Sequence, residues 1–232
     1  MSRQIPVGDA PLIDERSVKQ PVWDLPTRLV HWLTAALIGF SWWAGENEEL
    51  DLHIWSGIAV LSLLIFRLLW GIFGSSTARF SSFVRGPRAV RDYLGGKWKG
   101  IGHNPLGALS VVALLGAIAF QVGTGLLSSD EDGLASGPIA NLVSIDLSDK
   151  ITDLHEEFFN VLLALAGLHV AAIIFYRLRG KSLVAPMITG RAEIPPGTEP
   201  MSRGKWWIAL ICLAVAIGVT RWIIAGAPPF GT

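Results

Sequence analysis

The sequence of 232 residues has few charged residues and a single cysteine. Only 16% of its residues are charged, against about 25% in soluble domains, and 51% are hydrophobic. The 19 basic and 19 acidic residues cancel, so no basic excess indicates nucleic-acid binding. Because Cys212 stands alone and no Cys-x-x-Cys-His motif occurs, an intrachain disulfide and covalent c-type haem attachment are excluded. These figures argue for a membrane protein.

Five apolar stretches are candidates for transmembrane helices, which need about 20 mostly apolar residues. They are Leu29–Gly45, Leu52–Phe66 continuing past Arg67 to Ala78, Gly100–Ser129, a stretch from about Thr152 to Tyr176, and Trp206–Thr220 continuing past Arg221. The shorter ones reach spanning length if flanking charged side chains extend to the interface. We therefore predict an all-α integral membrane protein, with a four-helix transmembrane bundle and a fifth, C-terminal transmembrane helix.

Eight tryptophans lie toward the ends of these stretches, where indole rings prefer the headgroup level of a membrane. They are Trp32, Trp42, Trp43, Trp55, Trp70, Trp206, Trp207 and Trp222. The alternative is that these rings fill a protein core.

The loops between the stretches differ sharply in basic residues. Four basic residues precede the first stretch, six separate the second from the third and six separate the fourth from the fifth, whereas the other two loops contain only Lys150. By the positive-inside rule the N-terminus is cytoplasmic and, with five spans, the C-terminus is outside. The first 22 residues do not resemble a secretory signal, in keeping with a cytoplasmic N-terminus. In the basic loop after the second span, Pro87 is predicted to open a short surface helix.

All five histidines lie in or at the edges of the predicted spans, where ionisable groups are functional candidates. His155 and His169 are 14 residues apart on one helix, which places them on the same face and about 21 Å apart in depth. His53 starts the second span at the outer level of His155, and His31 starts the first span at the inner level of His169. Two pairs at two depths predict two haems, each held by two axial imidazoles, that form an electron path across the bilayer.

Other interpretations of the histidines are weaker. A single intramembrane histidine is often a core group or a proton relay. A zinc peptidase motif fails because Phe159 stands where a second histidine is required after His155. A carboxylate-bridged di-iron site is poorly supported, because only Glu156 and Glu157 accompany a histidine and both lie at the outer edge.

Three further residues are candidates for contacts to a haem propionate or a quinone. His103 has no histidine partner, and its alternative role is in capping, with Asn104 as the cap residue and Pro105 in the first turn of the third span. Arg67 lies at the inner level and suits a propionate, the alternative being a side chain that extends to the cytoplasmic surface. Gly57, Gly123, Gly125 and Gly167 suit close approach of a macrocycle or a helix.

Over about Val22–Arg191 the sequence resembles the bacterial cytochrome b561 family, which includes the cytochrome b subunits of nickel–iron hydrogenases. The resemblance rests on Val22-Trp-Asp-Leu-Pro-Thr-Arg-Leu-Val-His-Trp32, Leu52-His53, Phe66-Arg-Leu-Leu-Trp-Gly-Ile-Phe-Gly74, Ala78-Arg-Phe-Ser-Ser-Phe-Val-Arg-Gly-Pro87, Gly102-His-Asn-Pro-Leu-Gly107, Leu154-His155 and Leu168-His169. It implies two non-covalent b haems ligated by His31, His53, His155 and His169, electron exchange with quinone, and a bacterial inner membrane location.

The chain then divides into a cytoplasmic segment (residues 1–22), a di-haem cytochrome b core (23–191), a cytoplasmic linker (192–204), and a fifth helix with a short periplasmic tail (205–232). The fifth helix lies beyond the resemblance, and a role in binding a partner or in oligomerisation is open.

The leading functional prediction is electron transfer between a periplasmic redox protein and the quinone pool. The partner would be a c-type cytochrome, a hydrogenase or another dehydrogenase. The enzymatic alternative is a superoxide oxidase that reduces quinone, and a haem-free anchor or sensor is a third reading. An outer face rich in acids disfavours superoxide, which needs a basic funnel, and favours a partner with a basic docking face. These acids are Glu46, Glu48, Glu49, Asp51, Asp130, Glu131, Asp132, Asp146, Asp149, Asp153, Glu156 and Glu157.

Overall fold

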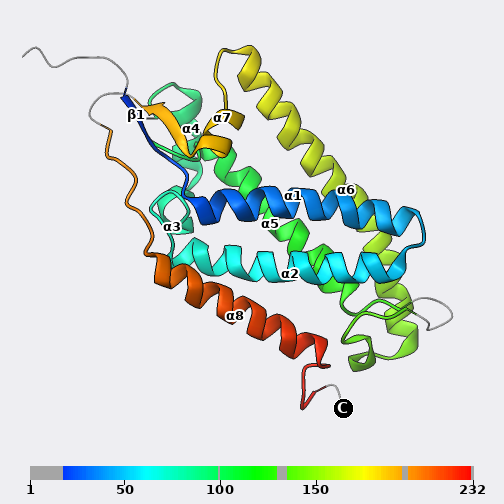
Figure 1. The fold of residues 1–232 in the computed structure, drawn as a ribbon. Coiled ribbons are helices and arrows are strands. Elements are labelled where there is room, and N and C mark those ends of the chain that lie inside the picture. The colour runs from blue at the N-terminus through cyan, green and yellow to red at the C-terminus, as the bar shows by residue number, and fades with distance from the viewer. Residues whose placement is uncertain (1–17, 99, 130–134, 195–197, 231–232) are drawn as a thin grey trace, which may run out of the picture.

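The computed structural model describes residues 18–98, 100–129, 135–194 and 198–230. Five long helices dominate it (Figure 1): α1 (Leu25–Glu46), α2 (Leu50–Phe73), α5 (Pro105–Gly125), α6 (Ile145–Leu178) and α8 (Trp206–Ile224). The short elements are β1 (Val18–Pro21), α3 (Phe80–Phe83), α4 (Pro87–Leu94), the 3-10 helix η1 (Ala140–Leu142), α7 (Val184–Thr189) and β2 (Arg191–Ile194). Asp130, Glu131 and Asp132 of the predicted acidic face lie outside the described residues.

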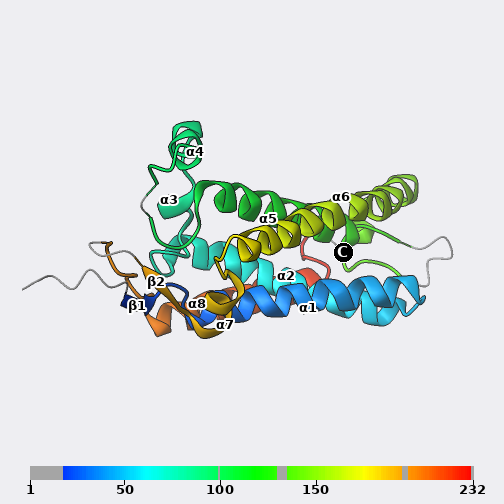
Figure 2. The same cartoon turned by 90° about the horizontal axis from the view of Figure 1, so that it is seen from above.

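The long helices form two layers. Figure 2 shows α5 and α6 lying over α1 and α2, with α8 next to α2. One apolar cluster joins α2, α5 and α6 through Val60, Leu64, Ala117, Ile118 and Leu162. A second joins α1, α2 and α8 through Val30, Phe66, Trp70, Cys212 and Ala216. The predicted four-helix bundle is therefore α1, α2, α5 and α6, and α8 packs on its outside against α2.

Four helices, α2, α5, α6 and α8, are long and apolar enough to cross a membrane, which confirms a multi-pass all-α membrane protein. The 22-residue helix α1 is long enough but less apolar, because Arg28 and His31 lie in its first two turns. Its sides nevertheless expose Leu29, Leu33 and Phe40. A membrane crossing by α1 stays a prediction.

Helix ends follow the local sequence. Asn104 caps α5, accepting a hydrogen bond from the Gly107 amide at 2.7 Å, and Pro105 occupies the first turn, as predicted. Pro87 opens α4, also as predicted. The helix α6 begins at Ile145, about seven residues earlier than expected. Its first turns contain acidic residues, so they did not look like part of an apolar span. One of them, Asp146 in the first turn, instead stabilises a helix N-terminus.

A two-stranded antiparallel sheet was not expected from the sequence. Pro21 of β1 pairs with Arg191 of β2, so the segment before α1 is joined to the segment after α6. Next to this sheet, the amides of Val22 and Trp23 donate to the Gly190 carbonyl at 2.8 and 3.1 Å. Four-residue strands give no clear period-two pattern, so sequence periodicity could not reveal them.

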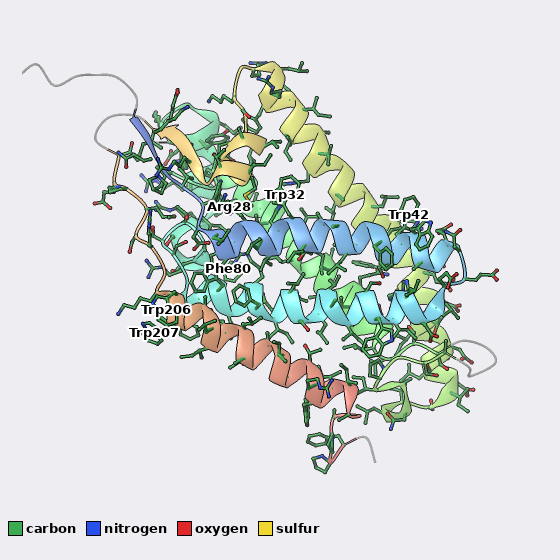
Figure 3. The ribbon with its side chains drawn as sticks, viewed as in Figure 1. Arg28, Trp32, Trp42, Phe80, Trp206 and Trp207 are labelled. Carbon is green, nitrogen blue, oxygen red and sulfur yellow. The ribbon has the colours of Figure 1, made fainter. Side chains whose placement is uncertain are left out.

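The tryptophans divide into two groups. Trp70 is only 1% exposed, and its indole N–H donates to Asp24 Oδ2 at 3.0 Å, so its interpretation as an interface residue is wrong. The other seven are exposed at or near helix ends. Figure 3 shows Trp206 and Trp207 at the start of α8 and Trp42 near the opposite end of the bundle.

Candidate functional site: two histidine pairs

The structure brings the four predicted histidines together in two pairs. The imidazole centroids of His53 on α2 and His155 on α6 are 5.9 Å apart. Those of His31 on α1 and His169 on α6 are 6.4 Å apart. Both α6 residues belong to one continuous helix, so the pairs are separated by about 21 Å along its axis.

Backbone carbonyls fix the protonation of the His53–His155 pair. His53 Nδ1 lies 2.8 Å from the carbonyl oxygen of Ser41, and His155 Nδ1 lies 2.9 Å from that of Gln121. Because a carbonyl oxygen only accepts, each Nδ1 carries the hydrogen when the ring is neutral, and each Nε2 keeps its lone pair. Thr124 Oγ1 adds a second contact to His155 Nδ1 at 3.0 Å. Histidines that ligate metals are oriented in this way.

A cavity of about 430 Å³ lies against this first pair, which we call the outer pair. This volume lies within the range of about 300–1,000 Å³ of small-molecule sites. Mostly apolar side chains line it, among them Ile38, Val60 and Phe159, and Glu46 and Glu156 also contribute to its wall. Gln121 also lines it, with a buried Oε1 that has no hydrogen-bond partner among the described residues.

Glycines make room for both outer rings. A Cβ at Gly125 would lie 2.9 Å from His155 Cε1, and a Cβ at Gly45 would lie 3.1 Å from His53 Nδ1. Of the glycines selected from the sequence, Gly125 thus adjoins a histidine, whereas added Cβ atoms at Gly57, Gly123 and Gly167 would meet only open space.

The second pair, His31 and His169, lies toward the opposite end of the bundle and is called the inner pair. Ser110 Oγ of α5 is 3.3 Å from His169 Nδ1. His31 Nδ1 is buried without a hydrogen-bond partner within the described part of the chain. Trp32 packs edge-on against the His31 ring, with centroids 4.9 Å apart.

His103 lies near the inner pair but does not join it. Its ring is held between Trp23 and Phe83, each with a centroid distance of 4.6 Å. Burial, and then the positive charge of Arg67, lower the pKa of His103 to about 3, so the ring is neutral at physiological pH. Its contact to a propionate or a quinone stays a prediction.

Arg67 does not extend to the surface, so that alternative was wrong. Its side chain is 8% exposed, lies over the Phe80 ring at 5.0 Å and donates to the Ala78 carbonyl at 3.3 Å. Figure 3 shows Phe80 at the end of the bundle where α2 finishes. Arg67 is thus a buried cation at the level of the inner pair, as its position 14 residues after His53 predicted.

Asn104 belongs to a polar cluster that sequence reasoning missed. The chain has only two tyrosines, Tyr93 on α4 and Tyr176 on α6, and their hydroxyls hydrogen-bond to each other. Asn104 Nδ2 donates to both hydroxyls, at 3.1 and 3.3 Å. No sequence spacing links these residues. Sequence reasoning also missed four polar residues that contact the paired histidines. The only feature that could have identified them is that they are polar positions within apolar stretches: Ser41, Ser110, Gln121 and Thr124.

The paired imidazoles fit haem iron better than a bare ion. A metal–imidazole bond is about 2 Å long, which places the centroids of two opposed rings roughly 6 Å apart. Both observed separations agree with this value. Within the described residues no three histidine, cysteine or acidic side chains cluster as a bare metal would require. The outer cavity supplies apolar volume next to the ligands.

An apolar helix bundle with two histidine pairs at two levels is the arrangement expected of a membrane cytochrome. The sequence model of the family "Prokaryotic cytochrome b561" matches residues 22–190, and the chain belongs to that family. Membership identifies it as a membrane b-type cytochrome of electron transfer. No curated protein and no solved structure matches the chain. The helix α8 lies outside the matched residues.

Proposed function

We propose that the protein is a di-haem cytochrome that transfers electrons across the bacterial inner membrane between a periplasmic redox protein and the quinone pool. The observation that supports this most is the presence of two histidine pairs, at centroid separations of 5.9 and 6.4 Å, on one continuous α6. The family supplies the cofactor class, haem b.

In this proposal His53 and His155 hold the outer haem, and His31 and His169 hold the inner one. Bound haem iron supplies one-electron oxidation and reduction. The residues of the chain hold the ligands in place. The Ser41 and Gln121 carbonyls keep Nε2 of the outer histidines free to bind, and Gly45 and Gly125 leave space for the rings. The apolar helices exclude water from the path between the pairs.

In the proposed orientation the N-terminus is cytoplasmic and α1 is an additional span, so the outer pair lies on the periplasmic side. The acids at the α1–α2 turn and on the first turns of α6 then face the periplasm. They include Glu46 and Glu156 beside the outer cavity. Complementary charge steers a partner with a basic docking face, such as a c-type cytochrome, a hydrogenase or another dehydrogenase. The same acids repel superoxide, so superoxide oxidation is the less favoured function.

Arg67, His103 and Asn104 lie at the cytoplasmic end. Arg67 provides a buried positive charge for a haem propionate, and His103, whose buried Nδ1 has no hydrogen-bond partner among the described residues, provides a hydrogen bond for a propionate or a quinone headgroup. Asn104 contacts such a ligand by exchanging one of its bonds to Tyr93 and Tyr176. The exposed apolar sides of α8 contact lipid, and this helix is also the candidate surface for an oligomer or a partner subunit.

The test is a reduced-minus-oxidised visible spectrum of the purified chain with a pyridine haemochrome count of haem per chain. We expect a b-type spectrum and two haems. A chain without a b-type band, or with one haem, contradicts the proposal. Superoxide-dependent quinone reduction at a rapid steady state would favour the enzymatic alternative instead.

A partner assay follows from the acidic rim. A basic c-type cytochrome should exchange electrons with the protein at a rate that falls steeply as salt rises from about 10 to 150 mM, because screening weakens steering between exposed charges. Glu46→Gln and Glu156→Gln together should slow the low-salt rate, with Glu193→Gln, an acid of β2 at the opposite end, as the control. A rate independent of salt and of the rim variants would contradict the docking face.

A further inference from the structure

A second cavity lies between the first turns of α1 and the short helix α7, next to Trp32, whose ring also packs against His31 of the inner pair. Its volume is about 450 Å³, and it is lined by Leu25, Arg28, Leu29, Trp32, Met187 and Ile188. We call it the α1–α7 groove. Five of its six side chains are apolar or aromatic, and Arg28 provides its only charge.

Local contacts hold the groove open in a defined shape. Trp32 Nε1 donates to the Met187 carbonyl at 3.2 Å, and Arg28 donates through one guanidinium nitrogen to the Ile188 carbonyl. Figure 3 shows Arg28 and Trp32 on the side of α1 next to α7. The chain turns at Gly190, next to Arg28, with a φ of 80°. A Cβ at this position would lie 2.8 Å from the Trp23 carbonyl oxygen and 3.3 Å from Arg28 Cζ. Only glycine suits that position.

Arg28 has spare hydrogen-bonding capacity. Its Nε is buried and has no hydrogen-bond partner among the residues that the structure describes. The nearest acid in the sequence, Asp24, already accepts from the Thr27 amide and from Trp70 Nε1. A guanidinium presents a fork of terminal donors that matches a phosphate, and the Arg28 side chain lines the wall of the groove.

The rest of the groove suits a hydrocarbon chain. Leu25, Leu29, Trp32 and Ile188 are each more than a third exposed, so they would contact lipid in a membrane. If α1 spans the membrane as proposed, its first turns lie at headgroup level, where Trp32 belongs to the interfacial aromatic residues. Basic pockets between membrane helices on the cytoplasmic side typically hold anionic headgroups.

We propose that the α1–α7 groove binds one anionic phospholipid, with its phosphate on Arg28 and an acyl chain along Leu25, Leu29 and Ile188. The charge and the apolar lining together select this ligand over a zwitterionic lipid. The bound lipid joins α7 and the adjoining β-sheet to the start of α1, which is the helix that carries His31.

The test is native mass spectrometry of the purified, haem-loaded protein with equimolar phosphatidylglycerol and phosphatidylcholine probes in detergent. Wild-type protein should retain phosphatidylglycerol with about a tenfold preference. Both lipids carry a phosphate, but the fixed positive charge of choline opposes that of Arg28. Arg28→Gln should abolish the preference, and Leu29→Trp should lower the occupancy of both lipids by filling the groove. Arg85→Gln is the matched control, because Arg85 is an exposed arginine near α4 that also donates to a carbonyl, that of Ser82.

Several outcomes would overturn the proposal: equal binding of the two lipids to the wild type, or identical spectra for Arg28→Gln and Arg85→Gln. Release of the lipid by inorganic phosphate would assign the site to free anions, and displacement by a quinone would assign it to that ligand. The haem count of each sample is a separate readout, so a failure of the di-haem proposal is distinguishable from a failure of the lipid site.

Discussion

His155 on α6 donates its Nδ1 hydrogen to the carbonyl oxygen of Gln121 on α5, 2.9 Å away. This bond fixes the tautomer and the orientation of the ring, so α5 positions a ligand although it carries none. The carbonyl oxygen of Ser41 on α1 likewise accepts from Nδ1 of His53 on α2, at 2.8 Å. The outer pair is therefore held by all four helices of the bundle, and its geometry depends on their packing as a unit.

The first prediction concerns the ligands. His53→Ala or His155→Ala should remove the outer haem, and His31→Ala or His169→Ala the inner one, lowering the haem count from two to one per chain. Two potentiometric waves should become one in each variant. The control is Leu168→Ala, which changes the neighbour of His169 at a side chain that is 68% exposed and should keep both haems. Two haems in all four alanine variants would refute the assignment of the ligands.

The second prediction concerns Gly125. In Gly125→Ala the new methyl group would lie 2.9 Å from His155 Cε1, so the ring must shift. We expect the outer haem to be lost or bound at least tenfold more weakly while the inner one is kept, which is measurable by haem titration. Gly116→Ala on the same helix is the control, because its Cβ would meet nothing within 4 Å. Equal haem affinity in the two variants would show that the close approach has no role.

Much of this architecture is predictable from the sequence because it follows from periodicity. Helical rise and turn place His155 and His169 on one face at two depths, and the apolar stretches place His31 and His53 opposite them. The cap at Asn104 and the start of α4 at Pro87 follow from local residue preferences. Each of these inferences needs only one helix at a time.

The misjudged features depend on tertiary contacts. Trp70 looked like an interface residue, yet α1 and α8 cover it and Asp24 accepts from its indole. The β1–β2 pair joins segments about 170 residues apart in four-residue strands. The meeting of Tyr93 with Tyr176 likewise requires the packing of α4 against the bundle, which no local pattern encodes.

A third prediction concerns pH. The pKa of His103 is lowered by burial to about 3 in the folded state, against 6.5 for a free histidine. Below pH 6.5 His103 binds a proton in the unfolded chain but not in the folded chain. The free energy of unfolding therefore decreases as the pH falls from 6.5 toward 3. Between pH 7.5 and 5.5 the loss should be about 1.4 kcal/mol.

Thermal unfolding in detergent checks this pH prediction. The apparent midpoint of the wild type should fall from pH 7.5 to 5.5 by more than that of His103→Phe, which has no such proton to bind. Parallel pH dependence in the two proteins would mean that His103 is not buried neutral.

The last prediction concerns how α4 is attached. Tyr93 hydrogen-bonds Tyr176 of α6 and accepts from Asn104, so Tyr93→Phe removes the polar link between α4 and the bundle at a cost of about 1 kcal/mol. Amide exchange over residues 87–94 should become faster in Tyr93→Phe and in Tyr176→Phe, with the haem count unchanged.

The same contact has a pH signature. Burial, and then the bond to Tyr176, raise the pKa of Tyr93 to about 12. The protection of these amides in the wild type, corrected for the intrinsic exchange rate, should therefore show no titration step between pH 6 and 9. Exchange that is unaltered in both variants would show that α4 is held by its apolar contacts instead of by the tyrosine pair.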